Sequence, residues 1–253
     1  MIDIHTHIMP GVDDGAKDIH MAIQMIRNAV AGGTTDIILT PHCATAYGFY
    51  NYDGEELEEH FQYLCREVAR LQIPVRLHPG MEVLYEGQEH FLYHEKDFYP
   101  LCGSRYLLVE HYFDISREGF LEGAETVRSC GYIPIVAHPE RYVCVQEDCL
   151  WGQKSLLLEA REKGALFQVN KGSLAGKHGE KSLQTSEWML EQDLVDFIAS
   201  DAHHPRFRNA GLWNVEKYIR KEFGPDRAKR LFEENPRCIV EDNKITGKHT
   251  GGK

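Results

Sequence analysis

Two histidines near the start of the chain, His5 and His7, are separated by one residue and follow the apolar alternation of residues 1–4. This pattern predicts a short buried strand that carries both imidazoles at its C-terminal end. Residues i and i+2 of a strand point to the same side, so the two imidazoles can reach one metal ion together. The alternative is a pair of hydrogen-bonded core histidines, and this motif alone leaves both interpretations open.

Similar polar residues end later apolar stretches of the chain. Asp201 and His203 repeat the one-residue spacing, and Glu82 and Glu110 each end an apolar run. Buried carboxylates are rare unless they are paired or bind a cation, so both glutamates are candidate ligands. The full set of candidate metal ligands is His5, His7, Asp14, His42, Glu82, Glu110, His138, Asp201 and His203.

These candidate ligands are imidazoles and carboxylates, without a thiolate. Such a set suits two or three divalent ions, and ligand softness does not choose among manganese, iron and zinc. Glu82 lies in the middle of the set, where it can bridge two ions about 3.5 to 4 Å apart, as in two-metal hydrolases.

Apolar strands and amphipathic helices alternate along the chain and must position these side chains. The predicted strands cover 1–5, 35–42, 75–83, 106–111, 133–138, 166–170 and 195–203, and the predicted helices cover 19–32, with Asp18 as N-cap, 55–71, 116–130, 155–163, 187–192, 213–223 and 226–234. Loops are expected over 43–54 and 172–181, and a short helix followed by a loop over 84–104. This order predicts an α/β fold with a parallel sheet, and the polar strand ends favour closure into a TIM-like distorted (β/α)7 barrel.

Composition limits the classes of partner. The net charge is −11 and no run of lysine or arginine stands out, which argues against nucleic acid and against an anionic membrane surface. The seven cysteines are scattered without a Cys-x-x-Cys pair, so neither a disulfide framework nor a thiolate zinc site is indicated. The same cysteine pattern is typical of a reducing cytoplasm. Without an apolar run long enough to span a membrane or a basic leader, we expect a soluble protein with one domain over 1–246 and a disordered tail over 247–253.

Several of these motifs resemble one known family. The segments His5-Thr-His7, Thr40-Pro-His42, Ala137-His138-Pro and Ser200-Asp201-Ala-His203, with Glu82 and Glu110, resemble the polymerase and histidinol phosphatase (PHP) superfamily of trinuclear metal phosphoesterases. Within it, the opening motif followed by Asp14-Gly15, and the segment His138-Pro-Glu-Arg141, look like the bacterial tyrosine phosphatases associated with capsule and exopolysaccharide synthesis.

The resemblance implies a PHP fold with three divalent ions, manganese before iron or zinc. It assigns His5, His7, Glu82 and Asp201 to one ion, Glu82, Glu110 and His138 to a second, and Asp14, His42 and His203 to a third. It also places Arg141 and Arg208 where the family contacts phosphate. A surface salt bridge is the alternative role for each arginine.

The resemblance also implies a substrate and a partner. The substrate would be a phosphotyrosine-containing tail of a membrane-associated tyrosine kinase that controls polysaccharide export. From its composition, we expect that the enzyme does not insert into the membrane itself. The oligomeric state is left open, a homo-oligomer included. Four aromatic residues of the 43–54 loop, Tyr47, Phe49, Tyr50 and Tyr52, either pack within the loop or contact such a peptide.

The chemistry of the residues themselves favours phosphoester hydrolysis. Three divalent ions would exceed the charge of four ligand carboxylates by about two units, which suits a phosphate dianion. No cysteine is followed six positions later by arginine, so the cysteine-based phosphatase mechanism is not indicated. A strong general acid is also not evident, which matters less for a phenol leaving group with a pKa of about 10.

Three other functions stay open from the sequence. The first is a PHP phosphatase that acts on a small molecule such as histidinol phosphate or a nucleotide. The second is a metal-dependent amidohydrolase, although that class typically has a carboxylated lysine where this chain has Glu82 and Glu110. The third is a regulatory module that captures phosphotyrosine segments without turnover.

Overall fold

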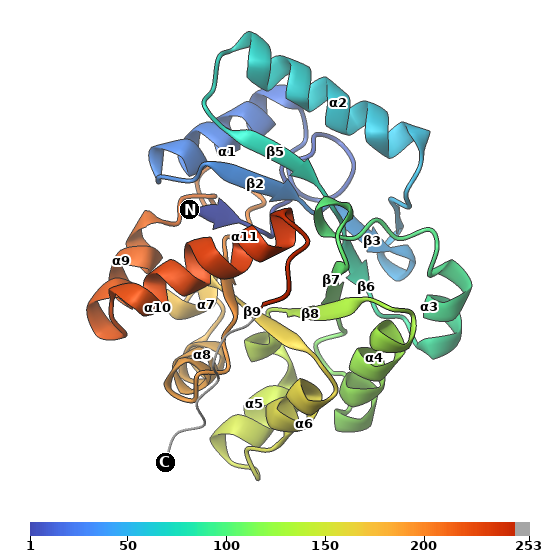
Figure 1. Ribbon diagram of the computed structural model, residues 1–253, viewed down its shortest axis with the longest axis vertical. Coiled ribbons are helices and arrows are strands. Elements are labelled where there is room, and N and C mark those ends of the chain that lie inside the picture. Colours follow the sequence, from blue (N-terminus) through green and yellow to red (C-terminus); the bar gives the residue numbers. More distant parts are fainter. Residues whose placement is uncertain (246–253) are drawn as a thin grey trace.

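The structure is a computed structural model that describes residues 1–245, with parallel strands at the centre and helices around them (Figure 1). The strands are β1 (Ile2–Asp3), β2 (Asp36–Leu39), β3 (His42–Ala44), β4 (Phe49–Tyr50), β5 (Arg76–Pro79), β6 (Glu82–Leu84), β7 (Tyr106–Glu110), β8 (Ile133–Ala137), β9 (Leu166–Asn170) and β10 (Phe197–Ala199). The predicted tail over 247–253, like the end of the predicted domain at residue 246, lies outside the described residues.

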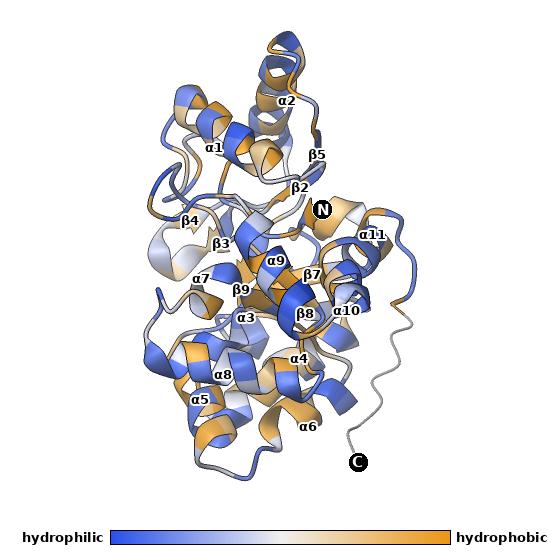
Figure 2. Ribbon diagram, turned by 90° about the vertical axis from the view of Figure 1, so that its left-hand side faces the viewer, coloured by the Kyte–Doolittle hydropathy of each residue, from blue (hydrophilic) through white to orange (hydrophobic). Residues whose placement is uncertain are grey.

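Helices lie between many of the strands, and three more follow the last strand. The helices are α1 (Ile19–Ala31), α2 (Glu55–Arg70), α3 (Gln88–His94), α4 (Arg117–Ser129), α5 (Val143–Leu150), α6 (Leu156–Glu162), α7 (Lys171–Leu174), α8 (Glu180–Glu191), α9 (Trp213–Glu222), α10 (Pro225–Lys229) and α11 (Asn235–Val240). Figure 2 shows hydrophilic and hydrophobic residues mixed along helices such as α1 and α2, as expected for helices with one face on a core. Between residues 1 and 245, no helix is both long and apolar enough to cross a membrane.

The hydrogen bonds arrange the strands in two sheets. One has the order β1-β2-β5, and the other has the order β10-β9-β8-β7-β6-β3-β4. All pairings are parallel except that of β3 with β4, which is antiparallel. The predicted α/β class with parallel strands is therefore confirmed.

The chain just after β1 links the two sheets at their C-terminal ends. The Thr40 amide donates to the carbonyl of Thr6 over 2.9 Å, and the His7 amide donates to the carbonyl of Ala202, also over 2.9 Å. Thr6 and Ala202 form an isolated parallel bridge. Complete closure into a seven-stranded barrel stays a prediction, but these bonds bring the ends of β1, β2 and β10 together.

Apolar side chains from both sheets pack against one another in the interior. Ile4, Ile38, Leu108, Ile135 and Ala199 belong to one buried cluster, and each is fully shielded from solvent. These residues come from or follow strands β1, β2, β7, β8 and β10. Because parallel strands that are covered on both faces need apolar residues on both, the strands appear in the sequence as nearly continuous apolar runs.

Helix α1 illustrates how the sequence places a covering helix. The Asp18 side chain accepts a hydrogen bond from the Met21 amide over 2.9 Å, which caps the helix as predicted. Ile23 and Ile26 of the same helix pack in a cluster with Ile37 of β2. The helix therefore covers the three-stranded sheet.

Two segments differ from the sequence-based prediction. The predicted strand over 75–83 is divided into β5 and β6, which belong to different sheets. The chain changes sheet at Gly80, where an added Cβ would lie 2.9 Å from the Leu101 side chain and 3.0 Å from that of Ile38. The predicted loop over 43–54 contains the hairpin of β3 and β4, turned at Gly48 with a φ of +83°.

Helical segments in the second half of the chain are more extensive than predicted. The predicted loop over 172–181 contains most of α7 and the start of α8, and helical structure continues through α11 to Val240. Helix α5 was not predicted because polar residues occupy its inner positions: Gln146 donates to the carbonyl of Glu140, and Asp148 accepts from the Leu156 amide. These buried polar residues hide the apolar period of 3.6 residues.

Candidate active site

The predicted metal ligands converge where the two sheets meet. They come from six places in the fold: the segments after β1, β8 and β10, the first residues of β3 and β6, and the last residue of β7. Asp14 joins them from the loop before α1. The structure therefore brings together all nine sequence-predicted ligands, namely His5, His7, Asp14, His42, Glu82, Glu110, His138, Asp201 and His203.

Glu82 lies at the centre of this cluster. Its Oε2 is 3.2 Å from the Nε2 atoms of both His5 and His7. The same oxygen is 3.0 Å from His42 Nδ1, and Oε1 is 3.2 Å from His138 Nε2. One carboxylate thus contacts four imidazoles, which is the position expected of a ligand shared between ions.

A first set of groups surrounds His5 and His7. Their Nε2 atoms are 3.1 Å apart, and Asp201 Oδ1 lies 3.5 Å from the first and 3.6 Å from the second. These three side chains offer ligand atoms close enough to hold one metal ion. All three are buried.

A second set includes both buried glutamates. His42, Glu82 and Glu110 offer ligand atoms within 4.8 Å of one another. His138 Nε2 lies 3.6 Å from Glu110 Oε1, and the His138 side chain is buried. His138 contacts Glu82 and Glu110, as the family resemblance implies, although it is not part of the tight ligand group itself.

A third set lies toward solvent. Asp14 Oδ1 is 3.4 Å from His203 Nε2 and 3.6 Å from His42 Nε2, and His7 completes the group. The Asp14 side chain is 57% exposed, whereas those of His42 and His203 are 12% and 8% exposed. The cluster therefore opens to solvent beside Asp14.

The charges of this cluster call for cations. Burial opposes the protonated form of His5, but the carboxylates of Glu82 and Asp201 outweigh it and raise the pKa of His5 to about 9. Burial likewise opposes protonation of His42, and Glu82 with Glu110 nevertheless raises its pKa to about 10. In the protein alone, imidazolium groups supply the positive charge that divalent ions can supply.

Burial favours the neutral forms of Glu110 and His138. Burial, together with the nearby charge of Glu82, raises the pKa of Glu110 to about 8. Burial lowers the pKa of His138 to about 4, which leaves its imidazole neutral and able to bind a metal. Oε2 of Glu110 is buried without a hydrogen-bond partner, and Oε2 of Glu82 is surrounded by three imidazole nitrogens at 3.0 to 3.2 Å. The donor set and these buried oxygens fit divalent metal ions.

Two residues that the sequence did not single out orient the histidines. Asp13 Oδ2 lies 2.8 Å from His7 Nδ1 and accepts from the His42 amide over 3.1 Å. Gln168 Oε1 lies 2.8 Å from His5 Nδ1. Carboxylate and carbonyl partners of this kind fix the ring orientation of metal-binding histidines. The sequence feature that could have indicated Asp13 is its position next to Asp14. Gln168 lies in an apolar strand, where no nearby feature of the sequence indicates its role.

Replacement of Asp13 by asparagine tests this supporting role. We expect Asp13→Asn to lower kcat/KM about 10- to 100-fold, because an amide can keep the contact but not the charge that favours one orientation of His7. The measurement is steady-state kinetics with p-nitrophenyl phosphate, together with titration of metal affinity. Asp18→Asn is the matched control, since asparagine caps a helix as well as aspartate does. Equal effects of the two substitutions would contradict the assignment.

The two predicted arginines lie beside Asp201. The Arg208 guanidinium contacts Asp201 Oδ2, and Arg141 Nη1 lies 3.9 Å from the same oxygen. Arg141 also lies over the ring of Phe113, 4.4 Å from its centroid. Both side chains are partly buried next to the ligand cluster rather than on the outer surface of the protein.

The aromatic residues of the 43–54 segment take different positions. Phe49 is stacked on the imidazole of His42, with ring centroids 5.6 Å apart. Tyr47 and Tyr50 are exposed, whereas Tyr52 stacks on His94 at 4.6 Å. Tyr52 therefore packs within the fold, Phe49 lies against the ligand cluster, and Tyr47 and Tyr50 are exposed on the same segment.

Comparison with known proteins gives the family of this chain. Tyrosine-protein phosphatase YwqE of Bacillus subtilis is 35% identical over 233 residues, which are 92% of this chain and 89% of that protein. Tyrosine-protein phosphatase CpsB of Streptococcus pneumoniae is 29% identical over 251 residues, which are 97% of this chain and 100% of that protein.

Solved structures agree with these relatives. A structure from the work on YwqE of Bacillus subtilis and CpsB of Streptococcus pneumoniae, described as metal-dependent tyrosine phosphatases, superposes with a TM-score of 0.87 and 34% identity over 100% of both chains. A histidinol phosphate phosphatase from Lactococcus lactis has a TM-score of 0.52 at 11% identity over 95% of this chain and 94% of that chain, a likeness of fold alone.

A family model supplies the last comparison. The model for capsular polysaccharide synthesis proteins of the CpsB/CapC type matches residues 1–241, nearly the whole described chain. This match and the relatives above agree with the ligand motifs and with the arginines beside them. The chain therefore belongs to the CpsB/CapC family.

Proposed function

We propose that this protein is a metal-dependent phosphatase that removes phosphate from tyrosine residues of a protein involved in capsular polysaccharide synthesis. The observation that carries this proposal is one cluster of five imidazoles and four carboxylates, buried except at Asp14, with two arginines beside Asp201. The relatives named as tyrosine-protein phosphatases support the same activity.

The proposed metal sites follow the three sets of ligands. His5, His7, Glu82 and Asp201 would hold one ion, Glu82, Glu110 and His138 a second, and Asp14, His42 and His203 a third, with manganese as the first candidate over iron and zinc. When bound, such ions supply an activated water and Lewis acidity toward the phosphoryl oxygens. Distances of 3.0 to 3.7 Å between candidate ligand atoms support shared ligation.

The two arginines would hold the phosphate. A guanidinium donates two parallel hydrogen bonds to phosphate oxygens, and the guanidiniums of Arg141 and Arg208 both lie beside Asp201 of the ligand cluster. Phe113 under Arg141 and Asp201 beside both guanidiniums restrict their positions. A phenolate leaves without strong protonation, so an aryl phosphate fits a site without a dedicated general acid.

A protein substrate fits the mouth of the site better than a small molecule. Asp14 opens the cluster to solvent, Phe49 stacks on His42, and the same segment carries the exposed rings of Tyr47 and Tyr50. We take these three rings as the rim of the opening. Such a rim gives an extended peptide apolar surface on either side of its phosphotyrosine. The specific partner that we propose is the tyrosine-rich tail of a membrane-associated tyrosine kinase, met in the cytoplasm, where the seven free cysteines would stay reduced.

Two variants test this assignment. Arg141→Ala should lower kcat/KM about 100-fold for both p-nitrophenyl phosphate and a phosphotyrosine peptide, because both present the same phosphoryl group. A shortened hairpin between Cys43 and Gly54 should instead reduce peptide turnover more than p-nitrophenyl phosphate turnover. Arg66→Ala, on the outer side of α2, is the control and should change neither rate.

Two results would contradict the proposed substrate. If the shortened hairpin leaves peptide turnover intact, the aromatic rim does not bind substrate. If histidinol phosphate is hydrolysed much faster than every phosphotyrosine peptide, the small-molecule phosphatase replaces the tyrosine phosphatase.

A further inference from the structure

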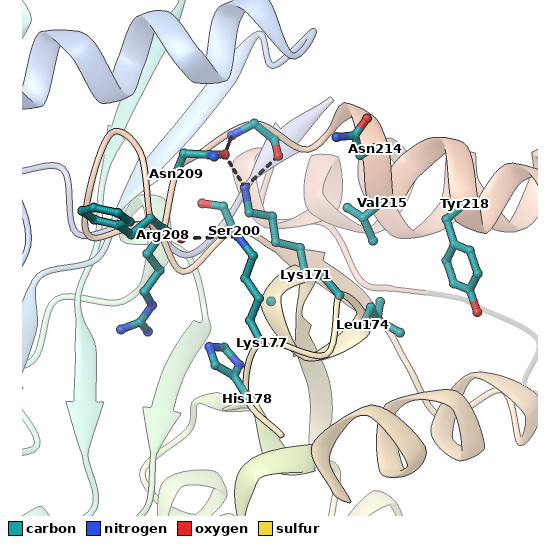
Figure 3. A pocket seen from close by; sticks show the side chains of 14 residues that line it. Lys171, Leu174, Lys177, His178, Ser200, Arg208, Asn209, Asn214, Val215 and Tyr218 are labelled. Carbon is teal, nitrogen blue, oxygen red and sulfur yellow. Dashed lines mark hydrogen bonds between the residues drawn. The ribbon is translucent and has the colours of Figure 1, made fainter. Parts of the chain in front are cut away.

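A separate pocket lies next to the arginine side of the active site. Its volume is about 380 Å³, within the usual range for pockets that bind small ligands or single side chains. Its walls come from α7 and the residues after it, from the loop over 207–211, and from α9. Figure 3 shows Arg208 and Lys177 on one side of this pocket and Tyr218 on the other.

The pocket is cationic, in contrast to a chain with a net charge of −11. Lys171, Lys177 and Arg208 line it, and among its lining residues, all within the described part of the chain, there is no aspartate or glutamate. Lys171 donates to Asn209 Oδ1 over 2.9 Å and to the carbonyl of Gly211 over 2.7 Å, so it holds the loop in place. Lys177 and Arg208 are therefore the two charges best placed to meet a ligand.

These two side chains differ in how firmly they are held. The Lys177 ammonium donates over 3.3 Å to the carbonyl of Phe207, and the residue is exposed. A neutral carbonyl at this distance leaves most of the ammonium charge uncompensated. Arg208 contacts Asp201 with one Nη atom, while its Nε is buried and has no hydrogen-bond partner. A ligand anion between Lys177 and Arg208 would have a cation on each side.

Arg208 belongs to both places. It reaches Asp201 in the ligand cluster and also forms the wall of the pocket. The apolar wall opposite, made by Leu174, Val215 and Tyr218, suits a side chain with a hydrocarbon stem. A group in this pocket can thus be part of the same molecule whose phosphate is bound at the metal site.

We propose that this pocket binds a second anionic side chain of the phosphotyrosine peptide, one that lies near the phosphotyrosine in sequence. The shared chemistry is an anionic oxygen group on a short stem, which either a glutamate or a second phosphotyrosine provides. This inference rests on the proposed tyrosine phosphatase function and specifies its substrate preference.

A peptide panel with the metal-loaded enzyme tests the proposal. The peptides carry one phosphotyrosine among alanines and, at each position from three before to three after it, alanine, glutamate or a second phosphotyrosine. At one or more positions the anionic residue should raise kcat/KM about five- to tenfold over alanine. A larger gain for phosphotyrosine identifies phosphate as the ligand, and an equal gain identifies any anionic oxygen group.

Substitutions of Lys177 connect this preference to the pocket. Lys177→Gln should remove the five- to tenfold gain while p-nitrophenyl phosphate turnover changes less than twofold, about the ordinary effect of losing one exposed charge. Lys177→Arg should keep the gain. Lys181→Gln is the matched control, because Lys181 is an exposed lysine on α8 outside the pocket. It should keep the gain as well.

Three results would overturn the proposal. The first is that no position of the peptide shows a preference for an anionic residue. The second is that the preference survives in Lys177→Gln. The third is that Lys177→Gln lowers p-nitrophenyl phosphate turnover as much as it lowers turnover of the anionic peptides.

Failure of the pocket must be distinguished from failure of the proposed function. Peptides with phosphonodifluoromethyl phenylalanine, a phosphotyrosine analogue that is not hydrolysed, allow binding to be measured without turnover. If no phosphotyrosine peptide is hydrolysed, the function is wrong. If the alanine version binds as tightly as both anionic versions, the one with glutamate and the one with a second phosphonodifluoromethyl phenylalanine, fluorescence anisotropy contradicts the pocket.

Discussion

Replacement of Glu82 by glutamine is expected to lower kcat/KM for phosphotyrosine peptides on the order of 1000-fold. Glu82 contacts four histidines at 3.0 to 3.2 Å, namely His5, His7, His42 and His138. Its negative charge therefore acts on histidines of all three proposed metal sites. The amide keeps the shape of the side chain but removes the negative charge that holds cations there. Steady-state kinetics and elemental analysis of the purified variant measure the effect.

The control for this variant is Glu89→Gln on the exposed side of α3. It should keep the wild-type rate and metal content. A loss of less than tenfold in Glu82→Gln, with unchanged metal content, would mean that Glu82 is not a shared ligand.

Removal of bound metal is expected to have an effect of similar size. Chelation should lower hydrolysis at least about 100-fold, and manganese should restore it, because every candidate ligand is an imidazole or a carboxylate. Metal should also raise the melting temperature, since it binds the folded protein in preference to the unfolded chain. Full activity of a preparation shown by elemental analysis to be metal-free would contradict the mechanism.

The pH dependence of metal binding follows from the histidines. Because the carboxylates, against the effect of burial, raise the pKa of His5 to about 9 and that of His42 to about 10, both rings are protonated at pH 7 in the metal-free protein. A metal ion binds only the neutral ring, so its uptake must release protons and its affinity must rise between pH 6 and pH 8. Calorimetry in two buffers with different ionisation enthalpies measures the number of protons released.

Most of the candidate ligands could be predicted from sequence because they directly end or follow a local pattern, whereas Asp14, in the loop before α1, was assigned from the family resemblance. His5 and His7 follow an apolar alternation, and Glu110 ends the buried strand β7. Where parallel strands lie side by side, their C-terminal ends gather at one edge, so an ordered list of strand ends becomes a list of neighbours. The α/β class followed from the same alternation of strands and helices.

Residues that support the ligands could not be predicted in this way. Gln168 reaches His5 across 163 positions of sequence, and Asp13 becomes relevant only because its loop folds back onto His7. The tight fold of that loop depends on Gly15, where an added Cβ would lie 2.0 Å from the carbonyl oxygen of His7. Such contacts depend on tertiary packing, which no local period encodes.

The division of the 75–83 strand had a different cause. An apolar run predicts burial but not the sheet in which the chain is buried, and Gly80 allows the change between sheets because a larger residue would collide with Leu101. A histidine next to a candidate ligand need not be a ligand itself. His111 directly follows Glu110, yet its ring lies among Phe120 and Tyr142, and burial lowers its pKa to about 3. It is a core histidine rather than a ligand.

The most direct test of the proposed activity is one comparison of substrates by the same metal-analysed enzyme. The measurement is kcat/KM for a phosphotyrosine peptide and for histidinol phosphate, with manganese and after chelation. We predict rapid, manganese-dependent hydrolysis of the peptide and slower hydrolysis of histidinol phosphate, with both lost on chelation. Peptide hydrolysis that persists without metal, or histidinol phosphate as the better substrate, would contradict a metal-dependent tyrosine phosphatase.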